Sequence, residues 1–105
     1  MKKRNGFGEF LRVSRSESGL GIRALSKRVG VSRTYLQRLE AGRDPPPAEP
    51  VVRAICRELE LELLPAMALA GRMPARVVRY VLAHPRELAR LYRLSRPRKK
   101  RPSET

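Results

Sequence analysis

The chain has few of the residues that build disulfides, metal clusters and base-stacking surfaces. Its 105 residues include one cysteine, no tryptophan and 5% aromatic residues. A single cysteine excludes an internal disulfide and a thiolate metal cluster, and the scarcity of aromatic rings argues against a surface on which nucleic-acid bases stack. No apolar run approaches the roughly 20 residues that a membrane-spanning helix needs. We therefore expect a cytoplasmic chain with no membrane attachment.

Groupings typical of catalytic sites are also missing. The sequence contains no evident carboxylate pair, glycine-rich phosphate loop or nucleophile paired with a base. The single histidine, His84, has no second candidate metal ligand near it in the sequence. Cys56 lies on the apolar face of a predicted helix, where a small buried residue is the simpler interpretation. We expect no enzymatic activity, no metal and no cofactor.

Charge is what the chain has in excess. Lysine and arginine number 24 against 10 acidic residues, which gives a formal net charge of +14. This imbalance indicates a polyanionic partner, with nucleic acid first and an anionic membrane surface second. Residues 63–105 hold 11 basic and two acidic side chains, so the C-terminal part is the more cationic.

The spacing of apolar residues predicts an all-α protein. Proline and glycine separate short amphipathic stretches, and no stretch alternates with period two for long. Phe7, Phe10 and Leu11 share one face of the first stretch. The predicted helices cover about residues 7–16, 22–29, 33–41, 50–59, 65–70, 75–83 and 85–94.

A short turn at Gly30-Val31 joins the second and third predicted helices. So few connecting residues force the helices to cross steeply, with Gly30 in the left-handed conformation and Ser32 capping the third helix. Leu25, Leu36 and Leu39 then meet with Val29 and Val31 in a small core. The outer face of helix 33–41 is left with polar side chains, namely Arg33, Thr34, Gln37 and Arg38.

These outer side chains are of the types that read DNA bases. Arginine can bond bidentately to guanine, glutamine to adenine, and threonine offers a hydroxyl or a methyl group. Basic residues that flank this face suit phosphate groups, which position a protein without specifying sequence. They are Arg23, Lys27, Arg28 and Arg43. Tyr35 lies at the edge of the apolar face, where it either packs or contacts DNA.

The segment ALSKRVGVSRTYLQRLEAG resembles the helix-turn-helix core of the phage-repressor and Cro family, also called the Xre family. The resemblance lies in Gly-Val-Ser followed by Tyr-Leu-x-Arg-Leu-Glu-x-Gly. The following segment, PPPAEPVVRAICRELELE, resembles the fourth helix of that family, and the match covers about residues 7–70. It implies a five-helix, lambda-repressor-like domain that inserts helix 33–41 into the major groove of double-stranded DNA, and dimers that bind paired half-sites.

The resemblance also implies roles for single residues. Base contacts would come from Arg33, Thr34 and Arg38, with Gln37 as a further candidate. Ser32 would cap the helix and touch a phosphate, and Arg43 would bind the backbone. Arg15 and Glu40 would form a structural ion pair that fixes the first helix on the third. The chain departs from the family pattern at Ile22, where a phosphate-contacting glutamine is usual, at Ala24, where an acid is usual, and at Ser26, where alanine is usual. Ser26 then needs a hydrogen bond, which a carbonyl one turn back can accept.

We predict four parts for the chain: a flexible basic arm (1–5), the helix-turn-helix domain (6–71), a helical extension (72–95) and a disordered basic tail (96–105). Segment MALAGRMPARVVRYVLAHPRELARL resembles an extension found in some Xre-type regulators. Its two helices either pack on the domain or form a dimerisation surface, built from Val77, Val81, Leu88, Leu91 and Tyr92. The tail either follows phosphates or a minor groove, or only keeps the chain in solution.

The sequence predicts a sequence-specific transcriptional regulator, most simply a dimeric repressor. Two alternatives stay open. One is an antitoxin or adaptor whose C-terminal helices bind a partner protein. The other is a general DNA- or RNA-binding protein that uses the same fold without reading bases.

Overall fold

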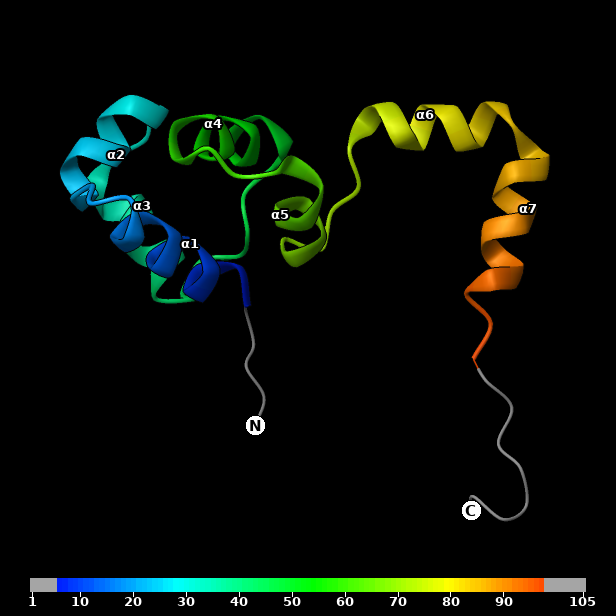
Figure 1. The fold of residues 1–105 in the computed structure, drawn as a ribbon, viewed down its shortest axis with the longest axis horizontal. Coiled ribbons are helices and arrows are strands. Elements are labelled where there is room, and N and C mark those ends of the chain that lie inside the picture. Colours follow the sequence, from blue (N-terminus) through cyan, green and yellow to red (C-terminus); the bar gives the residue numbers. More distant parts are fainter. Residues whose placement is uncertain (1–5, 98–105) are drawn as a thin grey trace, which may run out of the picture. The chain divides into compact units, whose positions relative to one another are not determined.

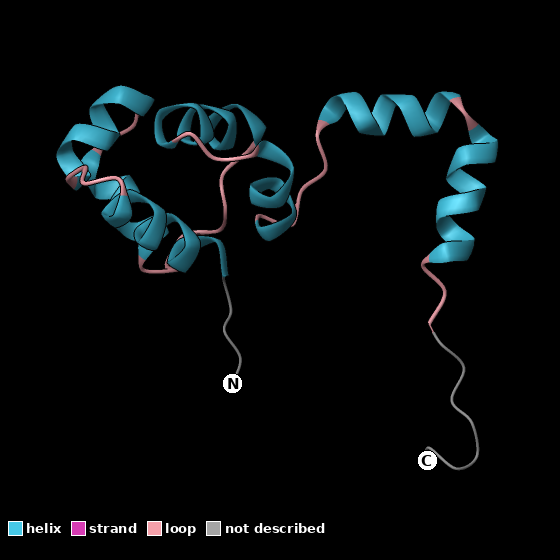
Figure 2. Ribbon diagram, viewed as in Figure 1, coloured by secondary structure: helices cyan, strands magenta, loops and turns pink. Residues whose placement is uncertain are grey.

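A computed structural model describes residues 6–97 of the chain. This part contains seven α-helices and no strand, which confirms the predicted all-α class (Figures 1 and 2). The predicted arm 1–5 and residues 98–105 of the predicted tail lie outside the described residues. The helices are α1 (Gly6–Glu17), α2 (Ile22–Val29), α3 (Arg33–Glu40), α4 (Glu49–Leu59), α5 (Leu63–Leu69), α6 (Ala75–Ala83) and α7 (Pro85–Leu94).

The described residues form two compact units, which are divided between Pro74 and Ala75. In the described residues the first unit holds α1 to α5 and the second holds α6 and α7. None of the described helices is long and apolar enough to cross a membrane.

Helix ends fall within two residues of the predicted positions. The largest difference is at α5, which begins at Leu63, whereas the sequence favours a start at Pro65. Proline is tolerated throughout the first turn, where the backbone N–H groups have no partner within the helix. Pro65 therefore marks the first turn of α5 without marking its first residue.

The first unit is built around one apolar core. Helix α1 contacts α3 and α5, α2 contacts α3 and α4, and α4 contacts α5. The predicted inner residues of the turn lie in this core: Leu25, Leu36 and Leu39 are buried, and Val29 and Val31 pack partly buried against them. The other buried members of the core are Phe7, Leu11, Val52, Ile55, Cys56, Leu59, Ala66, Met67 and Ala70.

Helices α1 and α3 approach each other backbone to backbone at Gly8. A methyl group added at Gly8 would collide with the carbonyl oxygen of Leu39 and press on that of Glu40. The missing side chain is thus what lets α1 lie directly on the last turn of α3.

The second unit buries much less. Val81 of α6 is buried, and no residue of α7 is. At the corner between the two helices the rings of Tyr80 and His84 stack with centroids 4.0 Å apart, and His84 Nδ1 donates to the carbonyl of Tyr80 at 2.7 Å. The large apolar side chains exposed in this unit are Val77, Tyr80, Leu82, Leu88, Leu91, Tyr92 and Leu94.

Candidate nucleic-acid interface

The turn between α2 and α3 is set by backbone hydrogen bonds to one carbonyl. Gly30 has φ +88°, the left-handed value predicted for it, and its N–H donates to the carbonyl of Ser26. The N–H of Val31 donates to the same oxygen at 3.0 Å. The hydroxyl of Ser26 is buried and donates to the carbonyl of Arg23 at 2.9 Å, as predicted. Serine therefore replaces the usual alanine without leaving a polar group unsatisfied.

Ser32 is the N-cap of α3, as predicted. Its backbone is extended, and its Oγ accepts a hydrogen bond from the N–H of Tyr35 at 3.0 Å. This bond satisfies one of the N–H groups that a helix leaves free in its first turn. Tyr35 itself is partly buried and packs against the core.

Helix α3 has one buried and one exposed face. Leu36 and Leu39 are 0% and 1% exposed, and the outer face carries exposed Arg33, Thr34, Gln37 and Arg38. With its side chains an α-helix is about 10–12 Å across, which fits the roughly 12 Å width of the DNA major groove. A surface hollow of about 320 Å³ adjoins this face and is lined by Thr34, Gln37, Arg38, Ala41 and Arg43.

The residues predicted to contact phosphates are all exposed, but they do not all gather at this hollow. Arg43 lines it together with three of the predicted base readers. Arg28 instead lines a separate hollow beside Glu58 and Glu60 of the α4 end. The remaining residues predicted to contact phosphates are also exposed, namely Arg23, Lys27 and Ser32.

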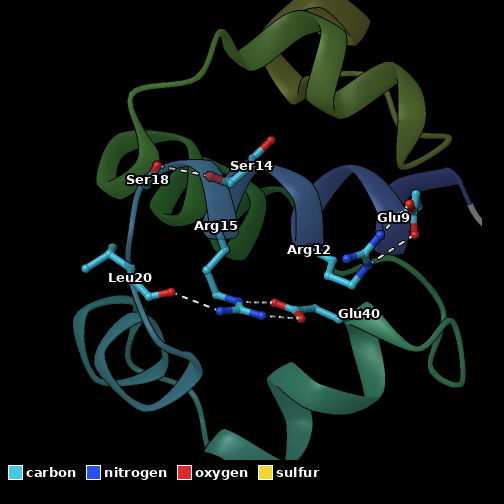
Figure 3. A network of polar contacts seen from close by, with 7 residues as sticks. All are labelled: Glu9, Arg12, Ser14, Arg15, Ser18, Leu20 and Glu40. Carbon is cyan, nitrogen blue, oxygen red and sulfur yellow. Dashed lines mark hydrogen bonds and ion pairs between the residues drawn. The ribbon is translucent and has the colours of Figure 1, made fainter.

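An ion pair joins α1 to α3. Arg15 Nε donates to Glu40 Oε2 at 2.6 Å and Nη2 donates to Oε1 at 3.0 Å. Arg15 Nη1 also donates to the carbonyl of Leu20 at 2.9 Å, which ties in the α1–α2 connection (Figure 3). The two side chains are only 18% and 9% exposed. The hydrogen bond to Glu40 raises the pKa of Arg15 above its ordinary value, although burial opposes this.

Figure 3 also shows an exposed pair on α1, between Arg12 and Glu9. Arg12 Nη2 lies 2.6 Å from Glu9 Oε2, and the side chains are 50% and 65% exposed. The two pairs have similar geometry, but the Arg15 pair bridges two helices and is shielded from water. Of the two pairs, the Arg15 pair is therefore the one that links α1 to α3.

Sequence reasoning missed a second ion pair, at the end of α3. Arg38 Nε donates to Asp44 Oδ1 at 3.0 Å, and Nη2 lies 2.8 Å from the same oxygen. The hydrogen bond to Asp44 raises the pKa of Arg38. A left-handed Gly42, with φ +75°, turns the chain back so that Asp44 comes beside Arg38. The available signal was an acidic residue two positions after a helix-ending glycine.

The described residues offer no obvious metal site. No group of three or more histidine, cysteine, aspartate or glutamate side chains comes together there. Cys56 is buried on α4, with its Sγ 3.9 Å from the carbonyl of Glu62. Burial raises the pKa of the Cys56 thiol, against a smaller opposite effect of Arg53.

Comparison with known proteins shows which family the chain resembles. A family model described as a helix-turn-helix domain matches residues 7–65. Transcriptional regulator ClgR from Mycobacterium tuberculosis, in strains CDC 1551 / Oshkosh and ATCC 25618 / H37Rv, is 37% identical over 78 residues. That alignment covers 74% of this chain and 69% of the regulator.

Solved structures agree with the sequence comparison. One crystal structure of the clp gene regulator ClgR from Corynebacterium glutamicum matches 64% of this chain and 86% of its own, with a TM-score of 0.55 and 28% identity. A second one matches 90% of this chain and 94% of its own, with a TM-score of 0.57 and 26% identity. The family model spans more than half of the chain, and the residues it matches include the α2–α3 turn, the Ser32 cap and the exposed face of α3. The chain therefore belongs to the helix-turn-helix domain family of DNA-binding transcription regulators.

Proposed function

We propose that this regulator is a sequence-specific repressor of the Xre, or phage-repressor and Cro, type, which reads the major groove with α3. The observation that carries the proposal is the outer face of α3, where Arg33, Thr34, Gln37 and Arg38 stand exposed above buried leucines. The Arg15–Glu40 pair supports it, because a reading helix must be held at a defined angle to place its side chains on base edges.

In this proposal the exposed residues divide into two groups. Arg33, Thr34, Gln37 and Arg38 meet base edges, and these contacts select the sequence. Basic and hydroxyl groups around them meet phosphates and fix the register of the protein on the duplex. This second group consists of Arg23, Lys27, Arg28, Ser32 and Arg43.

Repression follows from occupancy. A protein bound across a promoter excludes polymerase without any catalytic step, so the proposed chain is not an enzyme and needs no cofactor. The same proposal locates it in the cytoplasm, on the chromosome. We propose the four-part organisation (arm 1–5, domain 6–71, extension 72–95 and tail 96–105) as the one in which DNA reading is confined to the second part.

A selection experiment tests base reading. Wild-type protein is incubated with a randomised pool of DNA duplexes at near-physiological salt, and bound duplexes are enriched and sequenced. We expect one enriched motif. Arg33→Ala should weaken binding to it by about 1–3 kcal/mol and relax the preference at one base pair.

Arg57→Ala supplies the matched control, because it removes the same charge from an exposed position on α4. It should leave the preference intact. Recovery of no motif by the wild-type protein would exclude a sequence-specific regulator. Equal losses on the motif and on random duplexes would exclude base reading by Arg33.

The proposal includes a homodimer formed through α6 and α7. Both helices are amphipathic, and Leu88 and Leu91 of α7 are each 43% exposed. Exposed apolar side chains on a paired helical unit favour an interface. The larger ClgR match also covers more of the chain than residues 1–74 could supply, so it includes part of this unit. A dimer would place two α3 helices on two half-sites.

Sedimentation equilibrium tests the dimer. The double variant Leu88→Asp and Leu91→Asp should sediment as a monomer, and the wild type as a dimer. Leu64→Asp is the control, because Leu64 is also an exposed leucine, at 61%, and lies in the first unit. A monomeric wild type would overturn the dimer. Stoichiometric co-purification of another protein, lost in the double variant, would favour the antitoxin or adaptor alternative.

A further inference from the structure

Arg38, one of the proposed base readers, is already engaged within the protein. Its Nε–H and one Nη2–H point at a single oxygen of Asp44, at 3.0 Å and 2.8 Å. Side-chain exposure is 50% for Arg38 and 20% for Asp44. The arginine therefore faces solvent while the carboxylate beside it is shielded.

The geometry of a guanidinium decides what this contact leaves available. Arginine has five N–H donors in one plane, and Asp44 uses one edge of that plane. Nη1 and the second proton of Nη2 form a different edge, which is the shape needed for a bidentate bond to guanine O6 and N7. The Asp44 contact thus occupies Arg38 without blocking it.

Asp44 is itself held by a constrained loop. The N–H groups of Arg43 and Asp44 both approach the carbonyl of Arg38, at 2.9 Å and 3.4 Å. Proline follows at 45–47, where each ring fixes the φ angle of the backbone. Arg72, near the end of the first unit, donates to the carbonyl of Pro47 at 2.6 Å and to that of Pro46 at 2.8 Å.

We propose that Asp44 is a positioning residue that fixes the orientation of Arg38 and so determines specificity at one base pair. The inference rests on the proposed function and goes beyond it. An exposed arginine samples many rotamers, and ordering it on DNA costs free energy. Asp44 orders the guanidinium beforehand, so more of the energy of the base contact appears as discrimination.

The charge of Asp44 has a separate effect. A carboxylate beside the reading face repels the phosphate backbone and therefore lowers affinity for every DNA sequence alike. This repulsion leaves the ratio between specific and non-specific binding unchanged, so Asp44 acts on that ratio by orienting Arg38. An exposed pair of this kind adds little to stability.

The test uses the full chain and two probes, the duplex most enriched from the randomised pool and a scrambled duplex of equal length. For Asp44→Ala we expect the ratio of the two affinities to fall about three- to tenfold, with binding to the scrambled duplex unchanged or tighter. Arg38→Ala should lower the ratio at least as far. The Asp44→Ala change should have no further effect in the Arg38→Ala background.

Three other variants separate orientation from charge. Asp44→Asn keeps an acceptor oxygen and removes the charge, so it should recover part of the ratio. Glu9→Ala removes one acidic charge from the exposed pair on α1 and should leave the ratio unchanged. Arg72→Gln should lower the ratio in the same direction as Asp44→Ala but by less, because it only loosens the loop.

One measurement needs no DNA. The Nε–H of Arg38 should exchange slowly with solvent in a nitrogen-15 NMR spectrum of the free wild-type protein, and quickly in Asp44→Ala. An unchanged affinity ratio in Asp44→Ala, or a drop that persists in the Arg38→Ala background, would overturn the inference. Both results leave the proposed function standing as long as the wild type enriches a motif and Arg33→Ala weakens it. No enriched motif would remove the function and the inference together.

Discussion

Helices α4 and α7 make an instructive pair. They are 11 and 10 residues long, both have a proline among their first two residues, and both are amphipathic. Yet α4 buries five residues, and α7 buries none. An amphipathic pattern therefore establishes that a helix has an apolar face, but not what covers that face.

The difference follows from the neighbours that each helix has. Helix α4 lies against α2 and α5 in the core of the first unit, whereas α7 contacts α6. Two short helices cannot enclose a core, so most large apolar side chains of the second unit stay exposed. The proposed homodimer would supply a surface that covers these apolar side chains.

Truncating one leucine-sized residue on each helix should separate the two cases most clearly. Ile55 of α4 is 1% exposed, so Ile55→Ala should lower the free energy of unfolding by about 2–5 kcal/mol at every protein concentration. Leu91→Ala on α7 should act only at concentrations where two copies associate. Urea unfolding followed by circular dichroism at several concentrations measures both, and a large loss for dilute Leu91→Ala would contradict the contrast.

The next effect concerns packing inside the first unit. Gly8→Ala should lower the free energy of unfolding by about 1–3 kcal/mol, because the new methyl group meets backbone atoms of α3 that cannot yield without moving the helix. Gly6→Ala is the control, since its methyl group would make an ordinary contact, 3.6 Å from Leu69 Cδ2. Thermal melts compare the two. Equal melting temperatures would show that α1 and α3 tolerate a wider spacing.

The features that sequence reasoning predicted are local ones. The bounds of α2, the left-handed Gly30, the Ser32 cap and the bond from Ser26 each depend on residues within four positions. The helical spacing of Leu36 and Leu39 was enough to predict which face of α3 is exposed. Local rules fix these features before the helices pack.

What sequence reasoning missed depends on packing. The close approach at Gly8 requires α1 and α3 to be in contact, and the bonds from Arg72 to Pro46 and Pro47 span 25 or more residues. The Arg38–Asp44 pair spans only six residues but depends on how the loop turns after Gly42. The resemblance to a family named the Arg15–Glu40 pair, which spacing alone would not have indicated.

The Arg15–Glu40 pair should contribute less than core packing. Because both side chains are largely shielded, Arg15→Ala should lower the free energy of unfolding by about 1–2 kcal/mol, within the range for hydrogen bonds to charged groups. Arg12→Ala, in the exposed pair on the same helix, should change the melting temperature little. A double-mutant cycle with Glu40→Ala isolates the coupling. Absence of coupling would remove the pair as the element that fixes α3 on α1.

The smallest expected effect is a difference in thiol reactivity between a cysteine on α4 and one on α7. Cys56 is 5% exposed, and burial raises the pKa of its thiol, so at pH 8 less of it is present as the reactive thiolate. We expect native Cys56 to react with a disulfide reagent at least about tenfold more slowly than in urea, because opening of α4 must come first. In a Cys56→Ala background, Leu91→Cys should react at nearly its unfolded rate in dilute solution, since Leu91 is 43% exposed. The Cys56→Ala change itself should cost only about 1 kcal/mol. Equal reaction rates of the two thiols in the native protein would mean that Cys56 is as accessible to the reagent as residue 91. The contrast between a buried α4 and an exposed α7 would then be wrong.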